Sequence, residues 1–339
     1  MDPKATKPGK ALNNSNPRLS VVIHTEEEFD WDNGFYQSNT RVTHGKELID
    51  FCERLIEIGA KITFALDYAF VKSEEGKGVI QHFLPKMNSE VEFASHLHPW
   101  VNPPFDIKHN NSQNLRSGKE NPIDEKDSYP GNLSQELEFA KLKTLTEAIM
   151  DLTGQAPTTY LAGRYGIGKN TNSTLKKLGY KTDISISPFV DFGYQQGPDF
   201  SDFNNQAFTK NGIVNIPHTT GFVSHIPALS KYLNNNARNF KKLNNSVLGK
   251  ILFRLAGVKR HRLSPEGFSL NEMKQVTKAL LRTDTEHLIF SFHSPSVKLG
   301  LTPYVRSKEQ LLQFYESSYD FMVWFQGELS GQIETINKL

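Results

Sequence analysis

The chain has 339 residues and a formal net charge of +2 at pH 7. That length can bury one large α/β core, and the nearly neutral charge makes neither a nucleic-acid binder nor an acidic tail the first expectation. A single cysteine, Cys52, excludes an intramolecular disulfide framework and a cysteine-based zinc site. It also favours a reducing compartment.

Residues 1–18 are polar and basic, and they contain no apolar run that could serve as a signal peptide or a membrane span. We expect a disordered basic tail over residues 1–18, followed by a single domain over residues 19–339. The tail offers almost no apolar area, so it should add little to stability. These features together predict a soluble, cytoplasmic protein.

Strands and helices then alternate along the chain. Strands are expected at residues 20–25, 61–66, 90–98, 158–166, 181–187, 212–219 and 288–295. Helices are expected at residues 45–59, 78–87, 134–154, 172–179 and 307–329, and Cys52 lies in the first of them as a buried structural thiol. Residues 109–132 read as an extended polar loop. Repeated β–α units with short apolar strands predict a mostly parallel α/β sheet, which at this length closes into a barrel more easily than it stays open.

The first predicted strand is followed directly by a run of acidic residues. Residues 21–31, VVIHTEEEFDW, run from apolar positions into Glu26, Glu27 and Glu28. Adjacent carboxylates oppose one another's ionisation, so a positive charge should lie there, either a divalent cation or the Lys and Arg partners of a solvated loop. Glu26 shares a side of the strand with His24 by period-two alternation, and it is our candidate metal ligand. For Glu27 and Glu28 we expect the solvated loop.

A pair of histidines lies at the end of the third predicted strand. In EVEFASHLHPWVNPPF, His96 and His98 are two residues apart, which on extended backbone sends both imidazoles to one side. A carboxylate would complete a two-histidine site with open positions for water and substrate. We therefore expect Glu26, His96 and His98 to converge on a divalent metal, with Zn²⁺ as the expected ion.

Five motifs in order carry a resemblance to a known family: IHTEEEFDW, FASHLHPWVNPPF, SYPGNLSQELEFAKL, AGRYGIG and FSFHSPSVKLGLTPY. From about Leu19 to its end, the chain resembles the NodB-like polysaccharide deacetylases, in particular their WalW-type branch. The resemblance implies a deformed (β/α) barrel and a divalent metal, usually zinc, that activates water to attack the acetamide carbonyl of an N-acetylated sugar. It also implies an aspartate base, an arginine that orients the base, and a late histidine as general acid.

Carried over to this sequence, the resemblance gives the carboxylate and the histidine pair their metal roles, at a spacing shorter than the common His-x-x-x-His form. It makes Arg164 the orienting arginine and His293 the general acid, with Asp183 as a carboxylate that orients His293. One position departs from the pattern. Where the family's first motif usually carries the aspartate base, this chain has His24.

His24 leaves three alternatives open. A neutral imidazole can act as the base, because its ordinary pKa lies near the working pH. Next to a dication, His24 could instead be a third histidine ligand. The protein could also have lost hydrolysis. We expect an N-deacetylase of surface polysaccharide (O-antigen or capsule) biosynthesis, with a catalytically impaired saccharide binder or non-catalytic assembly factor as the alternative.

Four residues near the motifs are candidate substrate contacts. Aromatic faces commonly stack on sugar rings, and Trp100, Tyr165 and Tyr304 could do so, with core packing as the equal alternative. His218 follows a predicted strand, either as part of a substrate-facing wall or as a hydrogen-bonded loop histidine.

The segment of residues 231–262 has nine Lys or Arg and no Asp or Glu. Within it, apolar residues recur at helical spacing: Val247, Leu248, Ile251, Leu252 and Leu255. The common explanation is a solvated basic face over a packed apolar stripe. The sharper one is a collar for an anionic substrate, such as a lipid-linked saccharide at the inner face of a membrane.

Overall fold

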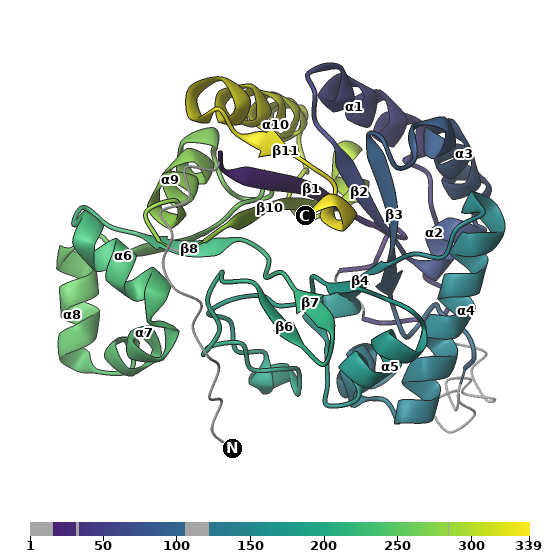
Figure 1. Ribbon diagram of the computed structural model, residues 1–339, viewed down its shortest axis with the longest axis horizontal. Coiled ribbons are helices and arrows are strands. Elements are labelled where there is room, and N and C mark those ends of the chain that lie inside the picture. The colour runs from purple at the N-terminus through teal and green to yellow at the C-terminus, as the bar shows by residue number, and fades with distance from the viewer. Residues whose placement is uncertain (1–15, 32–33, 106–121, 284) are drawn as a thin grey trace.

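The computed structural model describes residues 16–31, 34–105, 122–283 and 285–339 (Figure 1). Most of the predicted tail and residues 109–121 of the predicted polar loop therefore lie outside the described residues. The strands are β1 (Arg18–Thr25), β2 (Ile62–Leu66), β3 (Val91–Leu97), β4 (Thr159–Ala162), β5 (Thr182–Asp183), β6 (Phe208–Lys210), β7 (Ile213–Asn215), β8 (Thr220–Val223), β9 (Lys259–Arg262), β10 (His287–His293) and β11 (Gln332–Ile333). The α-helices are α1 (Gly45–Glu57), α2 (Tyr68–Lys72), α3 (Glu74–Phe83), α4 (Gln135–Thr153), α5 (Thr171–Lys177), α6 (Pro227–Asn235), α7 (Ala237–Asn244), α8 (Val247–Leu255), α9 (Leu270–Leu280) and α10 (Lys308–Leu329).

One curled sheet organises the molecule, in the order β10–β1–β2–β3–β4–β5–β7–β6, with β11 beside the start of β1. Pairing is parallel from β10 to β7 and antiparallel between β7 and β6. The side between β5 and β10 is bridged by single hydrogen bonds, such as Ser291 N–H to the Leu263 carbonyl. This curled, mostly parallel sheet is consistent with the predicted deformed barrel, although regular strands do not complete it.

Period-two alternation divides the side chains of β1 between two environments. Leu19, Val21 and Ile23 pack outward into the main core, under the helices that cover the outside of the sheet (Figure 1). Val22 belongs to a second cluster of apolar residues, and His24, on the same side of the strand, lines a cavity. The strand therefore carries its histidine inward, as its sequence pattern predicts. Among the described residues, no helix is both long and apolar enough to cross a membrane.

The basic segment folds into α6, α7, α8 and β9, which together with β8 form a lobe beside the sheet (Figure 1). This lobe has its own small core, in which Phe222 and Phe253 are buried. On α8 the positions turned inward are Gly249 and Phe253, while the predicted apolar stripe is exposed to solvent. The expectation of a packed stripe is wrong, because other residues of α8 do the packing.

A buried carboxyl joins α4 to α5. Glu138 accepts hydrogen bonds from Thr171 (2.5 Å) and Thr174 (3.4 Å), and burial raises its pKa to about 7. The folded chain holds this proton more tightly than the unfolded chain does. Protonation of Glu138 therefore stabilises the fold, and this contribution is fully present below pH 4.5 and is lost as the pH rises through 7.

Glu138→Gln should remove this pH dependence, because the amide stays neutral and still accepts a hydrogen bond from Thr171. Between pH 5 and 8 the free energy of unfolding of the variant should fall by roughly 2 kcal/mol less than that of the natural protein. Urea unfolding at several pH values measures the difference. Parallel curves for the two proteins would contradict it.

Candidate metal centre and active site

The carboxyl ends of β1, β3 and β10 meet at an open cavity of about 590 Å³. The polar residues that line it include His24, Glu26, His96, His98 and His293, and its aromatic lining includes Phe29, Trp31, Phe35, Trp100, Tyr129, Tyr165, Phe192, Tyr194 and Tyr304. A cavity with convergent polar groups and aromatic walls is the usual form of a small-molecule site.

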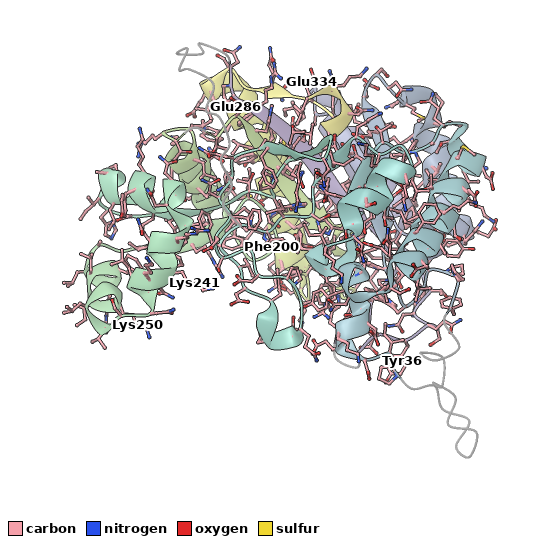
Figure 2. All side chains as sticks on the ribbon, turned by 60° about the horizontal axis from the view of Figure 1, so that its bottom comes forward. Tyr36, Phe200, Lys241, Lys250, Glu286 and Glu334 are labelled. Atoms are coloured by element: carbon pink, nitrogen blue, oxygen red, sulfur yellow. The ribbon has the colours of Figure 1, made fainter. Side chains whose placement is uncertain are left out.

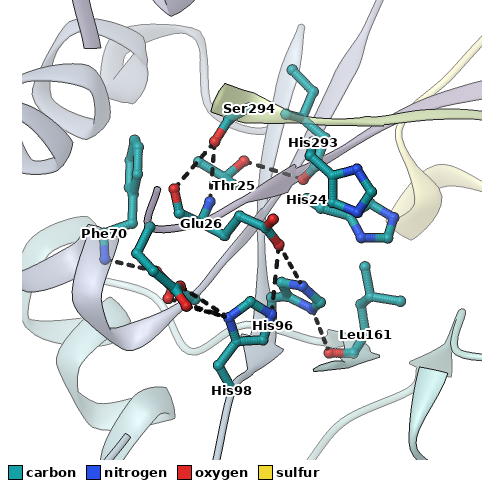
Figure 3. A network of polar contacts seen from close by, with 12 residues as sticks. His24, Thr25, Glu26, Phe70, His96, His98, Leu161, His293 and Ser294 are labelled. Carbon is teal, nitrogen blue, oxygen red and sulfur yellow. Dashed lines mark hydrogen bonds and ion pairs between the residues drawn. The ribbon is translucent and has the colours of Figure 1, made fainter. Parts of the chain in front are cut away.

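Glu26, His96 and His98 converge as the sequence predicted (Figure 3). Glu26 Oε2 lies 3.2 Å from His96 Nε2 and 3.5 Å from His98 Nε2. All three side chains are buried. Their ligand atoms lie within 4.8 Å of one another, which is close enough for one ion to reach all three.

The other nitrogen of each imidazole fixes its orientation. His96 Nδ1 faces the Leu161 carbonyl at 3.1 Å, and His98 Nδ1 faces a carboxylate oxygen of Glu27 at 2.9 Å. Each Nδ1–H donates to its oxygen, so each neutral ring turns an Nε2 lone pair toward Glu26. Acceptors that face one another need a proton or a cation between them. Burial is the main cause that lowers the pKa of both imidazoles, which disfavours a proton at this position. This donor set therefore fits a divalent cation.

Glu27 is buried, so the expectation of a solvated loop at this residue is wrong. Its carboxylate accepts from Trp100 Nε1 (2.8 Å) as well as from His98. Burial raises the pKa of Glu27 to about 7, and burial together with the charge of Glu27 raises that of Asp67 well above its ordinary value. The pair therefore prefers to keep a proton, and it orients His98. Asp67 was not predicted from the sequence, although it directly follows a predicted strand.

Glu28 has the basic partner that the sequence predicted. Arg41 Nε lies 3.1 Å from its carboxylate, and Thr43 donates to it through both its backbone N–H and its hydroxyl. His44, which the sequence analysis missed, lies 3.4 Å from Glu28 and 2.9 Å from the Ser294 hydroxyl. That hydroxyl accepts from the backbone N–H of Glu26 at 3.1 Å, so these contacts reach the main chain of Glu26 and not its carboxylate.

His24 lies between the metal candidates and a second buried histidine. Its Nε2 is 3.3 Å from His218 Nε2, and His218 Nδ1 faces the Ile184 carbonyl at 2.6 Å. Burial lowers the pKa of His218 to about 3 and that of His24 well below its ordinary value. The neutral His218 must therefore carry its proton on Nδ1. It accepts from His24 Nε2–H, which leaves the Nδ1 lone pair of His24 unprotonated.

His293 is held by a carboxylate, but the partner is Glu266. His293 Nδ1 lies 2.8 Å from Glu266 Oε2, and its backbone N–H donates to the same carboxylate. Against the effect of burial, Glu266 and Glu26 raise the pKa of His293 to about 9. The predicted contact with Asp183 is wrong: one oxygen of that carboxylate accepts from Ser185, and the other is buried with no hydrogen-bond partner among the described residues.

Arg164 lines the cavity, but its contacts lie away from His24. The guanidinium donates to Ser128 (2.6 Å) and Gln195 (2.8 Å) and lies over the Tyr129 ring at 4.2 Å. The described end of the predicted polar loop, from residue 122 to residue 132, thus forms a wall of the site. The arginine near the centre is Arg262 of β9, which lies over Tyr165 at 5.2 Å. Burial and the neighbouring histidines lower the pKa of His24, and the charge of Arg262 lowers it further.

The four substrate candidates separate into three situations. Tyr304, with a half-exposed ring parallel to that of His293, and the nearly buried Tyr165 both line the cavity. Trp100 also lines it, but its ring stacks on His98 at 4.2 Å and its N–H is bound to Glu27. His218 is fully buried behind His24 and is not among the lining residues. Trp31, which the sequence analysis did not select, lies 5.9 Å from Tyr304 across the cavity mouth.

Comparison with solved structures finds proteins of a similar fold. No family model matches the sequence, and no curated protein matches it. A proposed polysaccharide deacetylase from Mycobacterium smegmatis has a TM-score of 0.50 at 10% identity, over 98% of this chain and 92% of that one. PuuE allantoinase has a TM-score of 0.48 at 11% identity, over 100% and 96%. A family 4 carbohydrate esterase from Streptomyces lividans, in complex with acetate, has a TM-score of 0.43 at 8% identity, over 95% and 93%. At 10% identity the likeness to the Mycobacterium smegmatis protein shows the fold alone, which is of the polysaccharide deacetylase type.

Proposed function

We propose that the protein is a metal-dependent hydrolase that removes the N-acetyl group of a saccharide. The observation that carries the proposal is the convergence of Glu26 with two Nε2 lone pairs at one end of an open, aromatic-lined cavity. Glu26, His96 and His98 would hold the cation, with Zn²⁺ as the proposed ion. When bound, a divalent cation supplies Lewis acidity that polarises a carbonyl and lowers the pKa of water.

The residues around this centre supply the remaining chemistry. His24 presents the Nδ1 lone pair that can accept the proton of the attacking water. His293, kept protonated by Glu266, donates a proton to the amine as the C–N bond breaks. Oxygen from water joins the acetyl carbon, so the products are acetate and an amino sugar. Tyr304 and Trp31 offer ring faces to the saccharide.

We also propose the finer assignments that the motifs imply: the WalW-type branch, and a role in O-antigen or capsule biosynthesis. The substrate in this proposal is anionic or lipid-linked and is met in the cytoplasm at the inner face of the membrane. The cations Arg164 and Arg262 in the cavity lining support an anionic saccharide.

Acetate release tests the proposed reaction. Protein freed of metal with chelator and reloaded with Zn²⁺ should release acetate from N-acetylglucosamine oligomers at about 1 to 1000 per second. The chelated protein should release none, and an O-acetylated xylan separates amide from ester hydrolysis. Metal-loaded protein that binds the oligomer without releasing acetate would instead favour the non-catalytic saccharide binder.

A further inference from the structure

The outer face of α8 carries a group of exposed apolar side chains. Five apolar side chains on this nine-residue helix are between 44% and 81% exposed: Val247, Leu248, Ile251, Leu252 and Leu255. Their spacing of three and four residues places them on one continuous side of the helix. Single exposed apolar residues are common, but a contiguous group of this kind marks an interaction surface.

The orientation of α8 is fixed by the opposite side of the helix. Phe253 is buried, and its ring stacks on that of Phe240 at 5.5 Å. A Cβ on Gly249 would lie 2.0 Å from the Leu243 carbonyl oxygen, so α8 packs closely against the end of α7. Ser246 caps the helix by accepting from Gly249 N–H. The apolar face therefore points outward because its helix is held from behind.

Cations border this face. Lys250 and Arg254 are exposed on α8, and helical geometry places them along the Val247 edge of the apolar face. Figure 2 shows Lys250 at the outer end of the lobe, beyond Lys241. Lys241 pairs with Asp199, whereas no ion pair of Lys250 or Arg254 is found among the described residues. Residues 231–262 contribute no acid that would repel an anion.

We infer that α8 docks the protein onto an anionic lipid bilayer. The apolar face enters the boundary between headgroups and acyl chains, and Lys250 and Arg254 contact the phosphates. A second copy of this chain is the poorer occupant, because two such faces would bring their cations together. This surface lies outside the catalytic cavity, so the inference does not depend on the proposed reaction.

Co-sedimentation of the purified full chain with lipid vesicles tests the inference. The protein should bind vesicles that contain phosphatidylglycerol, should bind vesicles of phosphatidylcholine alone much less, and should be released by salt. The double variant Leu248→Ser, Leu255→Ser should lower the partition coefficient about tenfold, because two leucines no longer leave water. Lys250→Gln with Arg254→Gln should lower it mainly for the anionic vesicles.

A matched control comes from α10, where Lys308 and Leu312 are also exposed. Lys308→Gln with Leu312→Ser should bind vesicles like the natural protein. Absence of binding to anionic vesicles at low salt would overturn the inference, as would an equal loss in the α10 control. Light scattering that shows a dimer abolished by Leu248→Ser, Leu255→Ser would assign the face to self-association instead.

Discussion

Glu26→Gln is expected to abolish metal binding and, with it, acetate release. The amide keeps the shape of the side chain but removes the negative charge that faces His96 Nε2 at 3.2 Å and His98 Nε2 at 3.5 Å. Two neutral imidazoles would remain as ligands. Loss of an orienting partner of a metal ligand typically costs 10- to 100-fold in affinity, so loss of the ligand itself should exceed about 100-fold. Zinc titration against a competing chelator measures the affinity.

The two following glutamates provide matched controls of the same residue type. Glu27→Gln should weaken zinc binding about 10- to 100-fold, because in either orientation its amide NH2 would face an N–H donor, that of His98 or that of Trp100, where the carboxylate accepts. Glu28→Gln should bind zinc like the natural protein, because its carboxylate contacts Arg41, Thr43 and His44. Equal zinc affinity in the Glu26 and Glu28 variants would rule out the proposed centre.

These three glutamates also show how much of the site can be predicted from the sequence. Alternation along extended backbone was enough to place His24 and Glu26 on one side of β1 and to pair His96 with His98. It could not separate Glu27 from Glu28, because the difference comes from partners distant in sequence. Glu27 meets His98, 71 residues away, while Glu28 meets a partner within its own loop, 15 residues away.

The support of His293 was predicted wrongly for a related reason. The resemblance pointed to Asp183, which lies on β5, but the carboxylate comes from Glu266, in the segment between β9 and α9. A loop residue of this kind carries no periodic pattern, and its place depends on how the lobe packs against the sheet. The packing of the apolar stripe of α8 was predicted wrongly for a similar reason, since helical spacing predicts an apolar face but not which way that face points.

His24 is where this chain departs from the family pattern, and His24→Ala is expected to keep the metal while lowering turnover about 100- to 10,000-fold. Alanine removes the Nδ1 lone pair proposed to accept the proton of water, but leaves Glu26, His96 and His98 in place. Zinc content and acetate release, measured on the same preparation, separate the alternatives. A loss of zinc affinity comparable with that of Glu26→Gln would make His24 a ligand. His82→Ala is a suitable control, because that histidine pairs with Glu53 on the surface.

The complementary change, His24→Asp, introduces the residue that the resembled family usually carries, but the structure predicts a conflict. The shorter aspartate would remove the N–H donor that lies 3.3 Å from His218 Nε2 and would leave a carboxylate on the side of that lone pair, while burial keeps the pKa of His218 low and its ring neutral. Adding His218→Gln supplies an N–H donor at that side, and the Arg262 charge also favours a carboxylate. The double variant should therefore release acetate faster than His24→Asp alone. If the natural protein releases none and the double variant does, His24 is the reason for the lost activity. If His24→Ala matches the natural rate, the imidazole has no part in the reaction.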